Sequence, residues 1–304
     1  MNRRTFAKDL AAATLGATVL ANAPESARAG QAGEGANVPY NISVMLWTVF
    51  RDLPFEQKLE KVAEAGFNQV ELVGEYRKWS DEDFNRANAK RKELKIRFDV
   101  TAGLRHGVGN PGDRDAMLED VKNELPIMER IDCPAVIIMS GNVVPGMPRE
   151  QQHQSCIEGL KRAASIVEGK QIAGEPVRLL LENIDPEENP KYFMTSVAEG
   201  FDIIRAVNHP QVRLLYDFFH EQIAEGNLIE KLRKNIEYTG LVHIADVPGR
   251  HAPGTGEIHY DNIYKTLAEL NYSHGVAMEF LPLGDAVSEL RRAKEQALRG
   301  GKSS

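Results

Sequence analysis

The chain has 304 residues, of which 42% are hydrophobic and 27% are charged, a composition typical of a soluble globular protein with a large core. The formal net charge at pH 7 is −7, and an acidic chain without a basic stripe argues against nucleic acid as a partner. Beyond the N-terminal segment no stretch approaches the roughly 20 apolar residues of a membrane span. The two cysteines, Cys133 and Cys156, have no zinc-type spacing; we interpret both as packing residues, with a disulfide between them in an oxidising compartment as the alternative.

The first 29 residues follow the order of a twin-arginine signal peptide. NRRTFAK at residues 2–8 contains the arginine pair, an apolar run spans 10–23, and Ala27-Arg28-Ala29 is an A-x-A cleavage signal. We therefore expect residues 1–29 to be a leader, a mature start near Gly30, and export of the folded protein to the periplasm; a short N-terminal helix is the alternative. The leader has four basic and two acidic side chains, so its removal would change the formal charge from −7 to −9.

From residue 41 onward one pattern repeats: a short apolar run, a polar break and a stretch of helical periodicity. The apolar runs are 42–47, 69–73, 96–100, 135–139, 177–181, 213–217, 241–245 and 276–280. The helical stretches are 55–65, 81–94, 114–131, 151–169, 196–207, 228–238, 261–270 and 286–298. Eight of each in alternation predict an α/β protein with a (β/α)8 TIM barrel, forming a single catalytic domain over residues 38–300.

Four consecutive strands of this predicted barrel end in side chains that can bind a metal. They are Glu182 after VRLLL, Asp217 after VRLLY, His243 in LVHIAD and Glu279 after GVAM. Each has a small or apolar residue two positions earlier on the same strand face, namely Leu180, Leu215, Leu241 and Ala277. Because the active sites of such barrels lie at the C-terminal ends of the strands, we expect all four to converge at the mouth of the barrel.

Three carboxylates at a poorly solvated mouth repel one another unless a positive charge neutralises them. A divalent cation would do so, and oxygen ligands with one imidazole suit Mg²⁺ or Mn²⁺. For any one of the acids, a salt bridge to a nearby arginine or a position at a helix N-terminus is an equally good explanation. Four successive strands with the same kind of ending favour the metal site.

Several segments carry a resemblance to a known family. LLLENID at 179–185, LLYDFFHEQ at 214–222, HIADVPGRHAPGTGEIHYDNIY at 243–264 and AMEFLPLG at 277–284 resemble the hydroxypyruvate isomerases, within the wider xylose-isomerase-like barrel group that includes ketose 3-epimerases. The similarity extends over almost the whole expected mature chain. The ADVPGRHAPGTGEI stretch is its most specific part.

The resemblance implies one divalent metal ion and two catalytic glutamates. The implied metal ligands are Glu182, Asp217, His243 and Glu279, with Glu182 and Glu279 also serving as the acid/base pair. It further implies that His220 reaches a substrate oxygen, that Arg250 meets the anionic end of the substrate, and that Glu188 contacts the substrate.

The expected reaction interconverts hydroxypyruvate and tartronate semialdehyde, or a similar small keto-sugar, through an enediolate. It needs a proton removed from the carbon beside a carbonyl, and a metal ion that binds the carbonyl contributes several kcal/mol of stabilisation. One glutamate takes the proton and the other returns it to the neighbouring carbon, which is typically worth about 10²- to 10⁴-fold in rate.

Three positions depart from the family pattern and leave the substrate open. His243 stands where the bacterial hydroxypyruvate isomerases have glutamine, Ala252 stands where the loop usually has glutamate, and Asn183 replaces the usual proline after Glu182. A sugar 3-epimerase or an inosose-type dehydratase with the same metal site is therefore the alternative, followed by a non-catalytic exported protein that binds sugar acids. The metal identity and the oligomeric state are also left open, with a homo-oligomer as one outcome.

Two further features have two interpretations each. Trp47, at the end of the first strand, either forms a wall of the substrate pocket or is a plain core residue. The loop Pro253-Gly254-Thr255-Gly256 either holds an anion with its backbone N–H groups or is an ordinary turn, which we favour.

Overall fold

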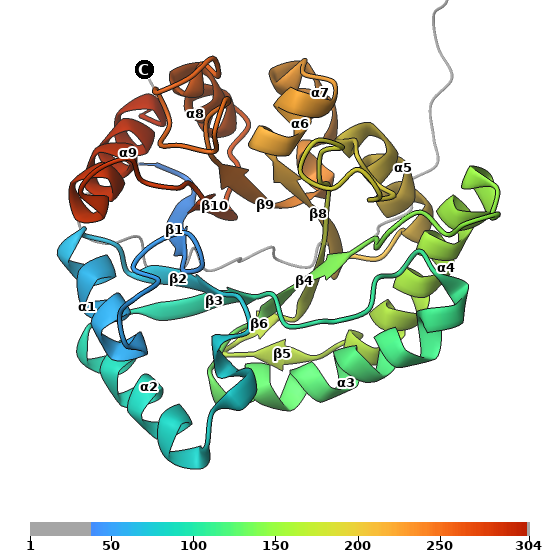
Figure 1. Ribbon diagram of the computed structural model, residues 1–304, viewed down its shortest axis with the longest axis horizontal. Coiled ribbons are helices and arrows are strands. Elements are labelled where there is room, and N and C mark those ends of the chain that lie inside the picture. The colour runs from blue at the N-terminus through green and yellow to red at the C-terminus, as the bar shows by residue number, and fades with distance from the viewer. Residues whose placement is uncertain (1–37, 303–304) are drawn as a thin grey trace, which may run out of the picture. The chain divides into compact units, whose positions relative to one another are not determined.

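The computed structural model describes residues 38–302, and in this part of the chain eight parallel strands close into a barrel. The order around the barrel is β1-β10-β9-β8-β7-β4-β3-β2, and Figure 1 shows these strands in a ring with the helices outside it. Their bounds are β1 Asn41–Met45, β2 Gln69–Leu72, β3 Arg97–Thr101, β4 Ala135–Met139, β7 Arg178–Glu182, β8 Val212–Asp217, β9 Thr239–Ile244 and β10 Gly275–Met278. The predicted TIM barrel is confirmed, whereas the expected leader lies outside the described residues.

The helices follow the strands in alternation, as predicted, with one addition. Between residues 38 and 302 the α-helices are α1 Phe55–Glu64, α2 Asp81–Glu93, α3 Arg114–Arg130, α4 Arg149–Val167, α5 Val197–Val207, α6 Phe218–Ala224, α7 Leu228–Asn235, α8 Tyr260–Glu269 and α9 Ala286–Gly300. The prediction of eight helices was wrong by one, because α6 begins directly after β8 with no polar break between them. No helix in this part of the chain is long and apolar enough to cross a membrane.

Short elements fill the connections between the barrel units. A two-stranded antiparallel hairpin, β5 Gln171–Ile172 and β6 Glu175–Pro176, precedes β7. Single 3₁₀ turns lie at η1 Glu75–Lys78, η2 Pro111–Asp113 and η3 Ile236–Tyr238. The last of these replaces the end of the helix predicted at 228–238.

Local capping explains several helix boundaries. Ser80 and Asp83 form a reciprocal capping box at the start of α2, in which each side chain accepts a backbone N–H of the other residue. Asp285 caps α9 by accepting the N–H of Ser288, and Asn208 ends α5 in the left-handed conformation with φ 51°. Ser80 and Asp285 therefore mark the starts of α2 and α9, and Asn208 marks the end of α5.

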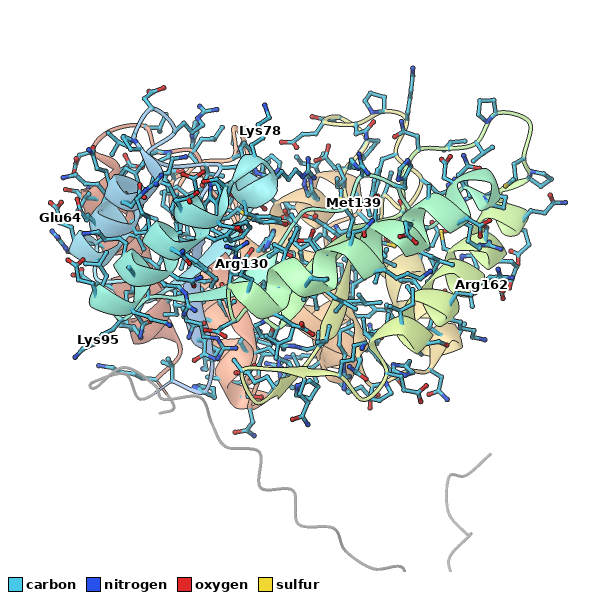
Figure 2. All side chains as sticks on the ribbon, turned by 90° about the horizontal axis from the view of Figure 1, so that it is seen from below. Glu64, Lys78, Lys95, Arg130, Met139 and Arg162 are labelled. Carbon is cyan, nitrogen blue, oxygen red and sulfur yellow. The ribbon has the colours of Figure 1, made fainter. Side chains whose placement is uncertain are left out.

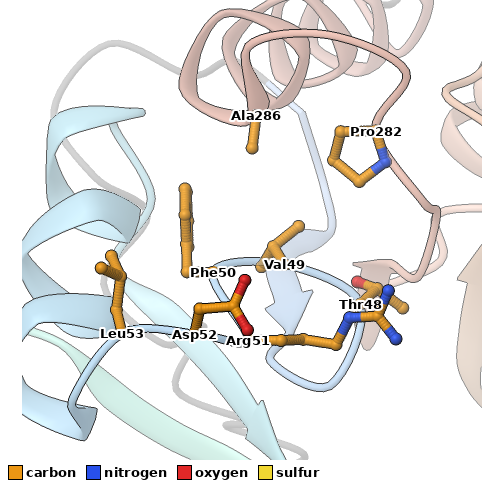
Figure 3. A pocket seen from close by; sticks show the side chains of 8 residues that line it. All are labelled: Thr48, Val49, Phe50, Arg51, Asp52, Leu53, Pro282 and Ala286. Atoms are coloured by element: carbon orange, nitrogen blue, oxygen red, sulfur yellow. The ribbon is translucent and has the colours of Figure 1, made fainter.

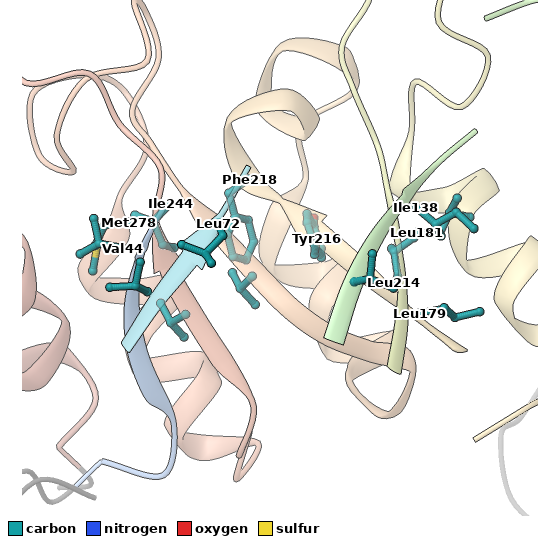
Figure 4. Close-up of a cluster of buried hydrophobic side chains, with 14 of the residues drawn as sticks. Val44, Leu72, Ile138, Leu179, Leu181, Leu214, Tyr216, Phe218, Ile244 and Met278 are labelled. Carbon is teal, nitrogen blue, oxygen red and sulfur yellow. The ribbon is translucent and has the colours of Figure 1, made fainter. Parts of the chain in front are cut away.

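Two hydrophobic cores hold the barrel. The larger lies between strands and helices, and Figure 4 shows its outward-facing strand side chains, among them Val44, Leu181 and Ile244. The smaller fills the interior with Met45, Val100, Ala135, Ile137, Leu180, Leu215, Leu241 and Ala277. Charged side chains such as Glu64 and Arg162 are exposed on the helices, whereas Met139, at the end of β4, is half-buried among the strands (Figure 2). Both cysteines are free and buried, as expected of packing residues.

Candidate functional site

The four residues expected at the barrel mouth lie together. Glu182 and Asp217 end β7 and β8, His243 lies near the end of β9, and Glu279 directly follows β10. Each offers one potential ligand atom, these atoms all lie within 4.8 Å of one another, and all four residues are buried. We call these four residues the mouth cluster.

Strand alternation explains why the mouth cluster points inward. Leu180, Leu215, Leu241 and Ala277, two residues before the four, all belong to the interior core. Since side chains two apart on a strand share a face, packing of these apolar residues in the barrel directs the polar ones to the same axis.

Asp217 is held by the start of the next helix. Its Oδ1 accepts the backbone N–H groups of Phe219, at 2.8 Å, and His220, at 3.2 Å, which caps α6. The side chain of Asn183 also pairs with the backbone of Asp217, accepting its N–H at 3.1 Å. These contacts leave Asp217 Oδ2 facing the cluster, 4.0 Å from His243 Nδ1.

His243 is oriented by a residue from across the barrel interior, and Glu279 by a residue that follows the neighbouring strand β1. His243 Nε2 lies 3.0 Å from Oε2 of Glu71, a fully buried residue of β2. Trp47 Nε1 donates to Glu279 Oε1 at 2.7 Å. The remaining atoms, His243 Nδ1 and Glu279 Oε2, are buried, lie 2.6 Å apart and have no partner in hydrogen-bond geometry.

The site shifts the pKa values of its members in opposite directions. Burial, together with the charges of Glu279 and Asp217, raises the pKa of Glu182 above its usual range. Against burial, the charges of Arg250 and His243 hold the pKa of Glu279 well below its usual range. Against burial again, the charges of Glu279 and Glu71 raise the pKa of His243 well above its ordinary value.

These features fit a divalent cation. His243 Nδ1 and Glu279 Oε2 are buried and have no partner in hydrogen-bond geometry, as expected of two atoms that could bind one cation together. The donor set of three carboxylates and one imidazole matches ions that prefer oxygen ligands, including Mg²⁺ and Mn²⁺. No cysteine contributes to the cluster.

Beside the mouth cluster lies a second polar group around Arg250. The guanidinium Nη1 contacts both carboxylate oxygens of Glu188, at 3.2 and 3.1 Å, and lies 3.1 Å from His220 Nε2. Nη2 lies 3.2 Å from Asp217 Oδ2 and 2.7 Å from Glu279 Oε2. His220 is held from behind by Asp185, whose Oδ2 is 2.5 Å from its Nδ1.

The backbone places Arg250 at some conformational cost. Its φ is 59°, in the left-handed region that non-glycine residues rarely adopt. Strain of this kind persists where surrounding contacts require the conformation, and it is common at functional sites. Here the guanidinium group lies 5.6 Å from the ring centre of Trp47 and 4.9 Å from that of Phe219.

The two polar groups open into one cavity of about 290 Å³. Six of the eight predicted site residues line it, while Asp217 and His243 lie deeper; the six are Trp47, Glu182, Glu188, His220, Arg250 and Glu279. The rest of the lining is apolar: Met45, Val73, Ala102, Leu104, Ile137, Met139 and Ile184. The cavity therefore combines a polar floor with apolar walls, as small-molecule sites usually do.

A second cavity, of about 340 Å³, has no comparable chemistry. It lies between the loop after β1 and the start of α9, and Figure 3 shows Arg51 and Asp52 as the charged side chains in its lining. Neither belongs to a potential metal-binding group among the described residues. The first cavity is therefore the candidate functional site.

The loop after β9 is organised by Asp246 and does not hold an anion. The carboxylate of Asp246 accepts the N–H groups of Gly254, Gly256 and Ile258, at 2.8, 2.9 and 3.0 Å. The backbone donors that an anion would need at 253–256 are thus already used, as expected of an ordinary turn. Asp246 fixes the loop that carries Arg250.

Three buried polar residues of the site were not found from the sequence: Glu71, Asp185 and Asn183. Glu71 carried a usable signal, because it is a charged residue between Val70 and Leu72 in an apolar strand. Asp185 and Asn183 lie in the loop after β7, and their partners become visible only in three dimensions.

Comparisons with known proteins agree with the barrel fold. The sequence model of the family described as "Xylose isomerase-like TIM barrel" matches residues 59–296. A 2-oxo-tetronate isomerase of Pectobacterium atrosepticum is 30% identical over 240 residues, which cover 78% of this chain and 90% of that protein. The hydroxypyruvate isomerase of Escherichia coli is 27% identical over 254 residues, covering 82% and 96%. A crystal structure titled AP endonuclease, family 2, from Brucella melitensis superposes with a TM-score of 0.73 at 26% identity, covering 83% and 96%.

Proposed function

The chain belongs to the xylose isomerase-like TIM barrel family, and on that basis we propose that it is a divalent-metal-dependent isomerase of small keto acids or keto-sugars. The proposed reaction interconverts hydroxypyruvate and tartronate semialdehyde or a closely similar compound. The prediction of an isomerase agrees with the names of the similar proteins from P. atrosepticum and E. coli. The observation that carries the finer proposal is the pair of buried glutamates, Glu182 and Glu279, whose carboxylates both lie within 3.6 Å of His243 Nδ1.

The two glutamates supply the proton transfer. Glu182 Oε1 lies 3.6 Å and Glu279 Oε2 2.6 Å from His243 Nδ1, and both side chains line the cavity. One glutamate, as the carboxylate, removes a proton from the carbon beside the carbonyl, and the other, in its protonated form, donates its own proton to the neighbouring carbon. A divalent cation held by Glu182, Asp217, His243 and Glu279 would supply Lewis-acid polarisation of the substrate carbonyl.

Arg250 is proposed to bind the anionic end of the substrate. Among the described residues that line the cavity it is the only arginine or lysine. Its partner Glu188 has a side chain that is 44% exposed. A substrate carboxylate can therefore replace Glu188 at Nη1, because the displaced Glu188 carboxylate is left in contact with solvent and not buried without a partner. His220 Nε2 lies beside the same nitrogen, and this position supports the proposal that it contacts a substrate oxygen.

A ketose 3-epimerase or an inosose-type dehydratase is the second candidate. It uses the same cluster, and His243, where glutamine is expected in the bacterial hydroxypyruvate isomerases, favours it. A non-catalytic binding protein would need the ligands but gains little from two glutamates that face one substrate. Cleavage of nucleic acid is disfavoured by the net charge of −7, since a polyanion binds basic surfaces.

The test is solvent proton exchange. The purified protein, loaded with Mn²⁺ or Mg²⁺, is incubated in deuterated buffer with hydroxypyruvate, ketopentoses, ketohexoses and inososes, and deuterium incorporation is followed by NMR. We expect deuterium at the carbon beside the carbonyl of a three- or four-carbon keto acid, together with the isomerised product. An epimer or a dehydrated product would identify the second candidate, and no exchange with any compound would contradict catalysis.

We also propose that residues 1–29 export the folded protein to the periplasm by the twin-arginine route. The proposal rests on the sequence pattern alone. Replacing Arg3 and Arg4 together by lysine should keep the full-length chain in the cytoplasm, as measured by cell fractionation. Export of that double variant at the normal level would contradict the proposal.

A further inference from the structure

Below the mouth cluster, the barrel interior contains polar groups that the proposed reaction does not use. Ser43 of β1 and Glu71 of β2 are fully buried, and Asp99 of β3 is 7% exposed. Ser43 Oγ donates to Glu71 Oε1 at 3.3 Å. Burying a charged side chain lowers the free energy of unfolding unless the charge is paired, so the presence of these residues in the interior requires an explanation.

Glu71 contacts the mouth cluster through one atom pair. Its Oε2 lies 3.0 Å from Nε2 of His243, a residue 172 positions away in the chain. The contact crosses the interior, because β2 and β9 are separated in the barrel by β1 and β10.

The contact decides which imidazole nitrogen faces the cluster. A carboxylate is an acceptor only, so the proton between the two groups belongs to His243 Nε2. Nδ1 is then the nitrogen available to the cluster, and it lies 2.6 Å from Glu279 Oε2 and 3.6 Å from Glu182 Oε1. A neutral residue at position 71 would hold the ring without a compensating charge.

We propose that Glu71 is a positioning residue for the metal site: it fixes the tautomer and ring orientation of His243 and increases the affinity of the mouth cluster for a divalent cation. Ser43 of β1 holds the other oxygen of Glu71, so Ser43 positions Glu71 of β2, which in turn positions His243 of β9. Partners of this kind orient metal-binding histidines and typically change metal affinity about 10- to 100-fold. The inference rests on the metal-binding part of the proposed function and is independent of which substrate is converted.

A merely structural role has to be separated from this one. A buried glutamate beside a histidine also contributes to packing and charge balance, and its loss would lower stability in either case. Glu124 of α3 offers a matched control, because it is 5% exposed and accepts a hydrogen bond from the Tyr76 hydroxyl on the outer side of the barrel. Glu124→Gln removes a buried carboxylate outside the mouth cluster.

The experiment measures the dissociation constants of Mn²⁺ and Co²⁺ by calorimetry on the metal-free wild-type protein and on Glu71→Gln, Glu71→Ala and Glu124→Gln. Circular dichroism establishes that each variant is folded, and the visible spectrum of bound Co²⁺ reports the ligand geometry. We expect Glu71→Gln to weaken binding about 10- to 100-fold, and Glu71→Ala to weaken it more and change the Co²⁺ spectrum. Glu124→Gln should stay within about twofold of wild type.

The isosteric glutamine variant keeps the test valid if Glu71→Ala does not fold. Binding by Glu71→Gln within about twofold of wild type would overturn the proposal, as would an equal loss in Glu124→Gln. Failure of the wild-type protein to bind either ion would instead contradict the metal site itself. Normal metal binding with no activity on any substrate would leave Glu71 in its proposed role and contradict only the isomerase.

Discussion

At the scale of single residues, three members of the mouth cluster each have one atom held by a neighbour. Asp217 uses Oδ1 to cap α6, and Glu279 uses Oε1 to accept from Trp47. His243 uses Nε2 to contact Glu71. Each of the four residues offers one potential ligand atom to the cluster, and these atoms lie within 4.8 Å of one another. A site arranged in this way is ordered before anything binds to it, which is a requirement for efficient electrostatic stabilisation.

Replacing either proposed acid/base should abolish turnover while the protein stays folded. Glu182→Gln and Glu279→Gln keep the shape of the side chain but remove its ability to take a proton, so we expect kcat to fall by at least about 10²-fold. The measurement is the rate of conversion of whichever compound the exchange panel identifies, with circular dichroism as the folding control. Near-normal activity of Glu279→Gln would contradict the two-glutamate mechanism.

Trp47 should act through its indole N–H. Trp47→Phe keeps an aromatic wall beside Arg250 but removes the donor to Glu279, a bond to a charged group worth about 1.5–3 kcal/mol. We therefore expect kcat/KM to fall about 10- to 100-fold. The chain has one other tryptophan, Trp79, which packs against Phe55 and Phe84 away from the cavity, so Trp79→Phe is the matched control. Equal losses in the two variants would assign Trp47 to packing alone.

At the scale of elements, apolar periodicity was enough to predict the barrel, and local chemistry explains where it failed. β4 has the predicted bounds 135–139, because its apolar run is flanked by polar breaks. α6 was missed because Asp217 both ends β8 and caps the helix, so strand and helix share one residue. The strand-end ligands followed from the fold, since parallel strands present their ends at one mouth.

The supporting residues of the site could not be predicted in the same way. Glu71 lies at the inward position of a strand without reaching its end, and its partner is 172 residues away. Asp185 is buried behind His220 in a loop whose course periodicity does not describe. Contacts of this kind depend on the register of several strands at once, which a single sequence does not contain.

A side-chain contact between Arg178 of β7 and His274, just before β10, should make folding stability depend on pH. Arg178 Nη1 lies 3.0 Å from His274 Nδ1, so the imidazole accepts and is neutral. Burial and the charges of Arg178 and Arg213 lower the pKa of His274 to about 4. The unfolded chain, with a histidine pKa of about 6.5, therefore binds the proton first on acidification.

Stability should consequently fall as the pH drops from about 6.5 to about 4, by up to about 3 kcal/mol. Urea denaturation of the wild type and of His274→Gln, both with EDTA, measures this between pH 4.5 and 7.5. The wild type should lose more stability than the variant on acidification, because glutamine cannot take the proton. Parallel stability curves for the two proteins would contradict a neutral His274 in the fold.

At the scale of the whole molecule, the closed barrel brings like charges close together at its mouth, which is electrostatically unfavourable. Three carboxylates of the mouth cluster are buried with Arg250 as the nearest arginine, and the walls around them are apolar. Such a cluster is unfavourable without a cation, so binding of one should stabilise the native barrel. The unfolded chain has no such arrangement to offer.

Metal removal should therefore lower the melting temperature. At a metal concentration about 100-fold above the dissociation constant, native-state binding contributes about 2.7 kcal/mol, which for a barrel of this size corresponds to about 5–10 °C. Thermal unfolding with EDTA and with saturating Mn²⁺ measures the difference. In Asp217→Asn, the asparagine side chain can still cap α6 but carries no charge, so the variant should melt with EDTA at or above the wild-type temperature and gain little from Mn²⁺. Identical melting temperatures of the wild-type protein in both buffers would show that the buried carboxylates do not destabilise the barrel when no cation is bound. That result would contradict a resident metal ion.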